Sequence, residues 1–145
     1  MNVDGHGLYG KVGFSLSSEG NWSCYRHCED CQRNCTAPIV TFMGISLENF
    51  FWRIEGGAQE PKFFSCSLGV HRFFCDKCCS PIAFQAEHYM GEIALYAATL
   101  TEPSVSQSQF HVHHKPSPSW LAINDNFPKF QESAPITKIP RSKEI

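Results

Sequence analysis

The chain has no block of basic residues. Its 12 lysine and arginine residues are scattered among 14 aspartate and glutamate residues, and the formal net charge is -2. A protein that binds nucleic acid directly usually neutralises a run of phosphates with clustered positive charge. We therefore expect no nucleic-acid partner and look for a small-molecule substrate instead.

The chain also lacks a long apolar run. The longest one, at residues 93–100, is far too short to span a bilayer. Residues 1–14 have neither the basic start nor the apolar stretch of a secretory signal. These absences predict a soluble cytoplasmic protein with no membrane partner. In that reducing compartment, the eight cysteines are expected to be metal ligands, reactive thiols or small buried side chains rather than disulfides.

No segment keeps an apolar period of 3.6 residues over three turns, so no long helix is expected. Short stretches rich in aromatic and β-branched residues alternate with turn residues instead, which predicts a mostly β fold with few short helical turns. Residues 46–54 stay open between a strand and one or two helical turns. The predicted strands are 8–16, 39–43, 62–67, 70–75, 81–85, 92–100 and 109–113.

The length of 145 residues suits a single hydrophobic core. We predict one domain over residues 1–132. From residue 133 onward the composition shifts to prolines and scattered charges, which bury too little apolar surface to offset the entropy lost on ordering. Residues 133–145 are therefore predicted to form a flexible tail.

Two Cys-x-x-Cys pairs stand out against this background. Cys28 and Cys31 form the first pair, and Cys75 and Cys78 form the second. Four thiols at such spacings can close a tetrahedral zinc site, because two thiolates three residues apart can point inward from one tight turn. The intervening residues 32–74 exceed the gap of compact four-cysteine zinc folds, so the two pairs either share one ion or belong to separate sites.

The first pair is flanked by Cys24 and Cys35, at spacings that one helical face could hold. These two cysteines either join a metal or thiol site or, like Cys66, are small buried hydrophobic residues. A single pair cannot hold zinc, because a structural site normally needs four protein ligands and a catalytic site at least three. Each pair must recruit further ligands or stay empty.

Histidines are the candidate recruits. His111 and His113 alternate along a predicted strand, which would place them on one face beside His114. Imidazole titrates near neutral pH and suits proton transfer. The alternative is a solvated, inert strand end. His27 and His71 are weaker candidates. Further acid–base groups would be Tyr96 and Glu92, if they face the same cleft.

Several motifs together resemble the glutathione-dependent formaldehyde-activating enzyme family, which also includes centromere protein V. Residues 5–10 resemble the family's opening Gly-x-Cys-x-Cys-Gly, residues 26–33 its Cys-His-Cys-x-x-Cys-Arg, and residues 74–81 its Phe-Cys-x-x-Cys-Gly-Ser-Pro. Further matches are residues 99–103 to Ser-Leu-Asp-Asp-Pro, the segment from His111 to His-Ile-Trp, and residues 120–128 to the Trp-led closing segment. Order and gaps are kept over residues 5–130.

The resemblance implies an Mss4-like fold, a β-sandwich or complex β fold of stacked antiparallel sheets. It also implies two zinc sites and chemistry on glutathione adducts. This chain departs from the pattern at both sites. Gly7 and Tyr9 stand where the opening cysteines are expected, and Arg26 stands where the first catalytic cysteine is expected. Cys75 and Cys78 are then remnants of a structural site, whereas Cys28 and Cys31 remain beside a fixed positive charge.

Three functions follow as hypotheses. In the first, the protein is a divergent enzyme of lyase or isomerase type that acts on a small electrophilic or thiol-adduct metabolite without the usual catalytic zinc. Such an enzyme would belong to specialised metabolism, and it could form a homodimer. Arg26 would hold an anion, Cys28 or Cys31 would be the nucleophile, and His111 or His113 would move protons. In the second, a carbon–sulfur lyase keeps one zinc and uses glutathione adducts. The third is a scaffold without activity.

Overall fold

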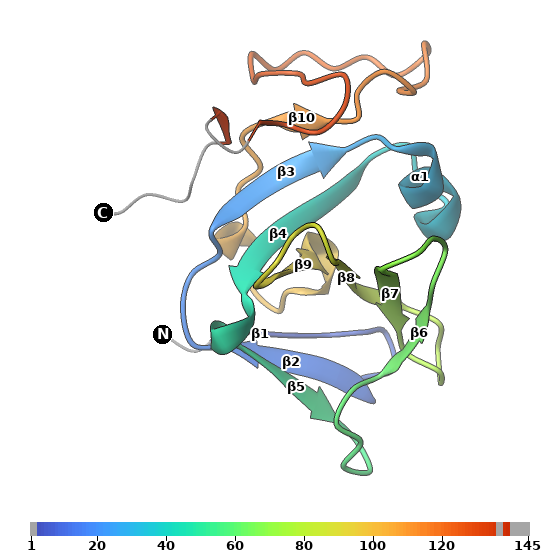
Figure 1. Cartoon of the computed structure of the whole chain (residues 1–145), viewed down its shortest axis with the longest axis vertical. Coiled ribbons are helices and arrows are strands. Elements are labelled where there is room, and N and C mark those ends of the chain that lie inside the picture. Colours follow the sequence, from blue (N-terminus) through green and yellow to red (C-terminus); the bar gives the residue numbers. More distant parts are fainter. Residues whose placement is uncertain (1–2, 136–137, 140–145) are drawn as a thin grey trace.

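The computed structural model of the protein describes residues 3–135, 138 and 139, and it contains two β-sheets and one α-helix (Figure 1). The smaller sheet has the order β1–β2–β5, and the larger has the order β10–β3–β4–β9–β8–β7–β6. Their strands are β1 (Val3–His6), β2 (Val12–Leu16), β3 (Trp22–Arg26), β4 (Val40–Ser46), β5 (Phe50–Ile54), β6 (Lys62–Phe64), β7 (Val70–Phe74), β8 (Pro81–Ala86), β9 (Glu92–Tyr96) and β10 (His111–Val112). The predicted mostly β class is confirmed.

Helical structure is confined to short elements. The α-helix is α1 (Glu29–Cys35), and the 3₁₀ turns are η1 (Leu47–Asn49), η2 (Ala97–Thr99) and η3 (Pro103–Val105). Neighbouring strands run antiparallel except for β10, which pairs with β3 in parallel. No helix in the described part of the chain is long and apolar enough to cross a membrane.

The large sheet is apolar on both faces because neighbouring residues of β4 point to opposite sides. Met43 and Ile45 belong to the cluster between the two sheets, whereas Phe42 belongs to a second cluster on the other face. Gly44 leaves room for Trp22 of the adjacent strand, since a Cβ there would lie only 2.1 Å from the indole Cε2. The second cluster, with Phe84 and its neighbours, forms the floor of the candidate site described below.

The structure answers one open question and corrects one prediction. Residues 46–54 contain both of the elements that were left open, because the helical turn η1 leads directly into strand β5. Cys24 does not share a helical face with the later cysteines, because it lies in β3 and only Cys31 and Cys35 lie in α1. The helix begins after Cys28, whose Sγ accepts a hydrogen bond from the Cys31 amide, and it ends at Thr36 in the left-handed conformation (φ 52°). Strands β1 and β3 were not predicted as separate elements.

The segment after β10 is irregular and lies along the outer edge of the large sheet, beside β10 and β3 (Figure 1). Phe130, Ala134 and Ile139 pack against the second cluster. The predicted flexible tail falls partly on this packed segment, and its residues 136–137 and 140–145 lie outside the described residues. Parts of the C-terminal region thus contribute to the wall of the site.

Candidate functional site

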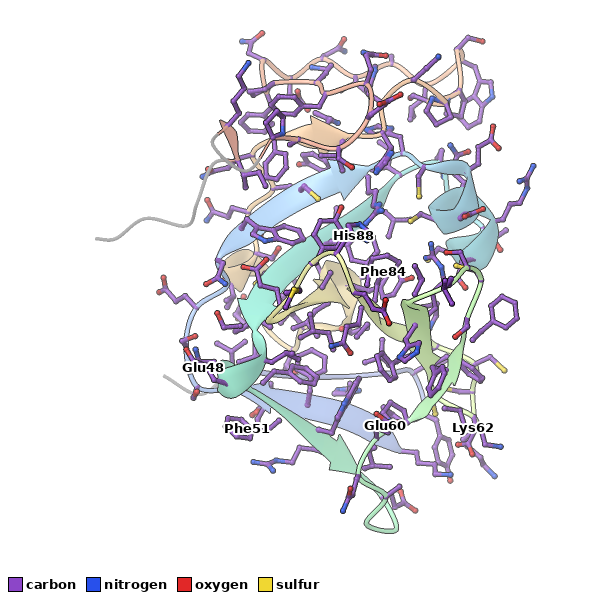
Figure 2. The ribbon with its side chains drawn as sticks, viewed as in Figure 1. Glu48, Phe51, Glu60, Lys62, Phe84 and His88 are labelled. Atoms are coloured by element: carbon purple, nitrogen blue, oxygen red, sulfur yellow. The ribbon has the colours of Figure 1, made fainter. Side chains whose placement is uncertain are left out.

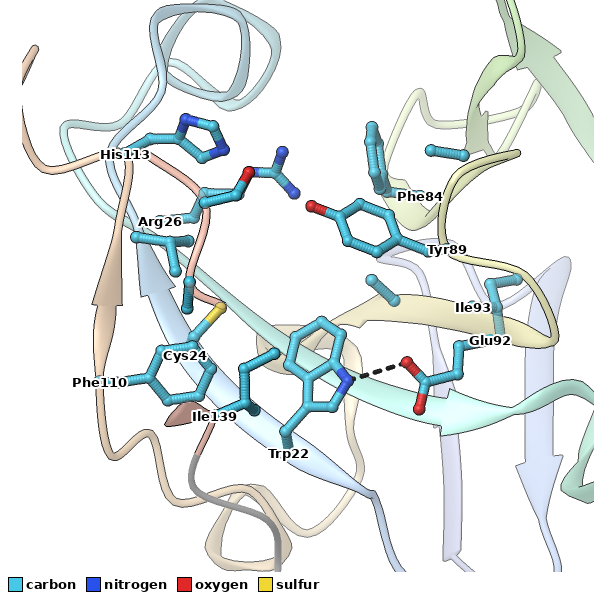
Figure 3. A pocket seen from close by; sticks show the side chains of 15 residues that line it. Trp22, Cys24, Arg26, Phe84, Tyr89, Glu92, Ile93, Phe110, His113 and Ile139 are labelled. Carbon is cyan, nitrogen blue, oxygen red and sulfur yellow. Dashed lines mark hydrogen bonds between the residues drawn. The ribbon is translucent and has the colours of Figure 1, made fainter. Parts of the chain in front are cut away.

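Alternate side chains of β3 and β10 line a small cavity, which we call the inner chamber (Figure 3). Trp22, Cys24 and Arg26 come from one face of β3, and Val112 comes from β10. The chamber has a volume of about 50 Å³, and Ile139 closes one side of it. It is therefore a narrow, mostly apolar space whose walls also carry the Arg26 guanidinium and the Glu92 carboxylate.

A wider cavity of about 420 Å³, which we call the outer cleft, continues from the inner chamber. The two share Arg26, Phe84, Tyr89, His113 and Ser133 in their walls. In Figure 2, Phe84 and His88, which line the outer cleft, lie near the centre of the view, whereas Phe51 extends from β5 of the smaller sheet. The remaining walls of the outer cleft include Cys28, Cys66, Arg72 and the first turn of α1.

Arg26 stands at the junction of the two cavities. Its guanidinium carbon lies 4.9 Å from the ring centre of Phe84 and 5.6 Å from that of Phe42, distances at which a cation is attracted to an aromatic face. Its Nε is buried and has no hydrogen-bond partner among the described residues. In Figure 3 the guanidinium points toward Tyr89 and Phe84.

Cys28 and Cys31 differ sharply in environment. A hydrogen bond from the Cys31 thiol is the largest cause that lowers the pKa of Cys28, and the charge of Arg26 acts in the same direction. The same hydrogen bond and burial raise the pKa of Cys31. Cys31 is fully buried, whereas Cys28 is half-buried and lines the outer cleft. Cys28 is therefore the thiol of the pair that is placed to meet a ligand as a thiolate.

Arg72 is a second buried guanidinium of this region, and the sequence did not single it out. It extends from β7 and donates to the Tyr96 hydroxyl at 3.2 Å, to Cys66 Sγ at 3.3 Å and to Cys31 Sγ at 3.7 Å. Like Arg26, it lies 4.9 Å from the ring centre of Phe84. No local motif marks it, because its role comes from contacts between β7, β9 and α1.

The remaining cysteines of the first cluster behave differently from one another. Cys24 is buried, and desolvation raises the pKa of its thiol to about 12, as expected for a small hydrophobic residue. Burial also raises the pKa of Cys35. The expectation that Cys66 is buried is wrong, because this side chain is exposed at the rim of the outer cleft.

His111 and His113 do not share a face, contrary to the expectation from strand alternation. Strand β10 ends at Val112, and His113 adopts a positive φ of 48°, which turns its side chain into the wall of both cavities. Burial and the nearby charge of Arg26 lower the pKa of His113, so its imidazole is neutral near pH 7. His111 points to the opposite side of β3, where its ring stacks on Tyr25.

A buried relay of hydrogen bonds holds His111 away from the cleft. Its Nδ1 lies 2.8 Å from Nε2 of His27, and its Nε2 lies 2.8 Å from a carboxylate oxygen of Asp125. The ring of His114 packs edge-on against His27 at 4.9 Å between centres. This network ties the start of α1 to the C-terminal segment, and its position indicates a structural role for His111.

Replacing His27 by glutamine is expected to flatten the loss of stability on acidification. Burial, and then the charges of His111 and His114, lower the pKa of His27 to about 4. In the unfolded chain the same imidazole takes up a proton near pH 6.5. The folded protein therefore loses stability as the pH falls from 6.5 toward 4, and at pH 5 its free energy of unfolding is about 2 kcal/mol lower than at pH 7. Urea unfolding at about pH 7 and pH 5 measures the difference.

Glutamine can keep the hydrogen bond to His111 but cannot titrate in this range. The matched control is His88→Gln, which changes an exposed histidine and is expected to keep the wild-type pH dependence. His113 and His114 also have lowered pKa values and destabilise in the same direction, so a residual pH dependence is expected. An unaltered slope in His27→Gln would contradict the assignment.

The second cysteine pair lies in the turn between β7 and β8, apart from the cleft. Cys75 is buried, and Cys78 Sγ accepts a hydrogen bond from the Tyr9 amide at 3.3 Å. The segment after β1 therefore does pass this turn, as the family pattern implies. It brings no thiol, however, and a Cβ at Gly7 would lie 2.9 Å from Cβ of Ser80.

Neither pair has the ligands that zinc needs. Among the described residues, no three His, Cys, Asp or Glu side chains converge as a metal site. Arg26 adds a fixed positive charge beside Cys28 and Cys31, and Arg72 donates to the Cys31 sulfur. The donor set therefore does not fit the zinc sites that the family pattern implies, and the four cysteines do not form one quartet.

Two other residues named as acid–base candidates are placed by the structure. The Tyr96 hydroxyl accepts a hydrogen bond from Arg72, and Tyr96 does not line the outer cleft. Glu92 lines the inner chamber, where its carboxylate accepts a hydrogen bond from Trp22 Nε1 at 3.1 Å (Figure 3). The carboxylate also accepts a hydrogen bond from Asn21 Nδ2 at 2.8 Å. His71 stacks on Phe63 at 4.2 Å between ring centres and does not line either cavity.

The chain is similar to known proteins in both sequence and fold. A family model described as glutathione-dependent formaldehyde-activating enzyme matches residues 2–116. The crystal structure of a Rhodobacter sphaeroides protein, a Northeast Structural Genomics target, is 16% identical, with a TM-score of 0.53 over 68% of this chain and 87% of that chain. That likeness concerns the fold alone. No curated protein is significantly similar to the chain.

Proposed function

Because the chain belongs to the glutathione-dependent formaldehyde-activating enzyme family, we propose that it is an enzyme whose thiolate, Cys28, acts on a small electrophilic or thiol-adduct metabolite. The reaction is of lyase or isomerase type and does not use the zinc sites implied by the family pattern. One observation carries the proposal: Cys28 lines an open cleft together with Arg26, and its Sγ accepts a hydrogen bond from the Cys31 amide.

The contacts of Cys28 support a nucleophilic role. The Cys31 thiol and the Arg26 guanidinium both stabilise a negative charge on Cys28 Sγ, which favours the thiolate that attacks carbon. Cys31 is too buried to reach a ligand itself. Arg26 also offers donors to a negative charge that develops on the substrate during the attack.

Reversible addition provides an isomerase reaction without a further reactant. The Cys28 sulfur donates its electron pair to an electrophilic alkene carbon, and a carbon–sulfur bond forms while the double bond becomes single. The substrate then rotates about its new carbon–carbon single bond. Expulsion of the thiolate breaks the carbon–sulfur bond and restores the double bond in the other geometry. Arg26 stabilises the transient anion, so no proton needs to enter or leave.

A lyase reaction needs a base, and His113 is placed for it. Its neutral imidazole lines both cavities and can accept a proton from the carbon beside a carbon–sulfur bond. The electron pair then forms a double bond as the thiolate leaves. The outer cleft has a volume within the range of small-molecule sites and is the larger of the two spaces for a thiol adduct.

The test is a panel of unsaturated acids, unsaturated aldehydes and S-substituted glutathione adducts, followed by mass spectrometry and product analysis. Wild-type protein is expected to turn over at least one compound, and Cys28→Ser is expected to lose about 100-fold or more of that activity, a typical loss for a nucleophile. Cys79→Ser is the matched control, because Cys79 is an exposed cysteine of the other pair's turn. Turnover that survives in Cys28→Ser would refute the proposal.

The scaffold hypothesis makes the opposite prediction for the same panel. A protein without a ligand site shows no turnover and no rise in melting temperature with any compound, because only a ligand that binds the native state stabilises it. That result for the wild-type protein would replace the enzymatic proposal.

A further inference from the structure

One donor of the Arg26 guanidinium, Nε, is left without an acceptor among the described residues. The Nε atom is buried, while the Arg26 side chain lines the outer cleft together with Cys28. An unsatisfied buried donor is costly, and the Nε–Nη edge of arginine matches the two oxygens of a carboxylate. This edge therefore has the geometry of a receptor for a planar anion.

The charges around the junction favour an anion as well. No carboxylate among residues 3–135, 138 and 139 lies within ion-pair distance of Arg26 or Arg72. The nearest acidic side chains in the cavity walls are engaged elsewhere or exposed: Glu29 pairs with Arg33, and Asp30 is exposed on the first turn of α1. Arg26 therefore lines the outer cleft with Cys28 but has no carboxylate partner among those residues, which leaves room for a further negative charge.

The space beyond Arg26 limits what the anion can carry. The inner chamber is lined by apolar side chains such as Ala94, Phe110 and Val112. Its volume of about 50 Å³, against about 420 Å³ for the outer cleft, suits a short substituent rather than a long chain. At the far end of the chamber, the Glu92 carboxylate accepts hydrogen bonds from Trp22 and Asn21. Its negative charge repels a second anion at that end.

We propose that the substrate is a monocarboxylate with a compact apolar substituent. Its carboxylate pairs with the Nε–Nη edge of Arg26, and three or four carbons occupy the inner chamber. This inference rests on the proposed function in one respect: Cys28 and Arg26 line the same cleft, so the electrophilic carbon is the β carbon, close to the carboxylate. The carboxylate site itself does not depend on the reaction.

Binding is measured on Cys28→Ser with saturated, unreactive probes, by ligand-observed NMR and calorimetry. Butyrate is expected to bind about tenfold or more tightly than butyramide, which has the same shape without the charge. Butyrate should also bind more tightly than acetate, which leaves the chamber unfilled, and more tightly than octanoate, which is too long for the chamber. If butyrate and butyramide bind equally tightly, the inference is wrong, and no variant of Arg26 is needed to show it.

Variants then locate the site. Arg26→Lys keeps the charge but loses the two-donor edge and is expected to weaken butyrate about tenfold, whereas Arg53→Met, on the exposed face of β5, is the matched control for adventitious binding. Ala134→Leu fills the chamber from the C-terminal segment and should weaken butyrate but not acetate. Ala98→Leu, outside both cavities, should change neither. Loss of butyrate binding in Arg53→Met would contradict the assignment to Arg26.

The two proposals fail separately. If Cys28→Ser binds butyrate as described but the wild-type protein converts no electrophile, the carboxylate site stands and the enzymatic proposal falls. If the wild-type protein converts an uncharged electrophile through Cys28 and no carboxylate binds, the reverse holds.

Discussion

Between about pH 8 and pH 6, the rate at which iodoacetamide alkylates Cys28 is expected to change by less than about threefold, whereas a free cysteine peptide slows nearly 100-fold. A free thiol titrates near pH 8.5 and loses most of its thiolate over this range. The pKa of Cys28 is lowered first by the hydrogen bond from Cys31 and also by Arg26, so Cys28 remains a thiolate. Peptide mapping by mass spectrometry follows Cys28 separately from the exposed Cys66 and Cys79.

Variants of the two supporting residues identify the cause. Cys31→Ala removes the thiol donor and Arg26→Met removes the charge, and each is expected to restore a dependence on pH by raising the pKa of Cys28. Cys79→Ser should leave the profile unchanged. A Cys28 rate that follows the free peptide in the wild-type protein would contradict the thiolate assignment and remove the main support for nucleophilic chemistry.

Replacing Phe42 by alanine is expected to lower the free energy of unfolding by about 3–5 kcal/mol. Phe42 is fully buried in β4, which lies between β3 and β9 in the large sheet. Its ring centre lies 4.6 Å from that of Tyr96 and 6.0 Å from that of Phe84. The truncation leaves a cavity that rigid strands on both sides cannot fill. Urea unfolding followed by tryptophan fluorescence measures the loss.

The same substitution also removes an aromatic surface from under Arg26. Phe51→Ala is the matched control, because Phe51 lies in β5 with 46% of its surface exposed and should cost only about 1 kcal/mol or less. A loss below about 1 kcal/mol for Phe42→Ala would mean that the second hydrophobic cluster is not packed as described.

The strands were largely predictable because their signal is local. Aromatic and β-branched runs between turn residues marked the positions of β2, β4, β6, β7, β8, β9 and β10. Strand β3 was missed, since Trp22 to Arg26 alternates polar and apolar residues only weakly and merges with the cysteine cluster. The boundary between η1 and β5 also escaped prediction, because periodicity over a few residues cannot separate a turn from a strand.

The candidate site was predictable only in part. Cysteine spacing and the motif comparison pointed to Cys28, Cys31 and Arg26, which the structure brings together at one cleft. The partnership of His111 with His113 failed, because a positive φ at His113 ends the strand alternation. Arg72, Phe84 and Tyr89 were not found, since each belongs to a distant strand or turn and carries no motif of its own.

The sequence by itself determined the β class, the two cysteine pairs and the absence of enough thiols for the zinc sites of the family pattern, because these depend on composition and spacing. Only the tertiary structure decided that Cys28 is the open thiol, that His111 faces a buried relay and that Arg26 joins an apolar chamber to an outer cleft. The physical reason is that exposure, desolvation and charge pairing arise between strands far apart in the chain. The spacing of residues in the sequence identifies the candidate reactive groups. The packing of β3, β8, β10 and α1 decides which of these groups lie close together.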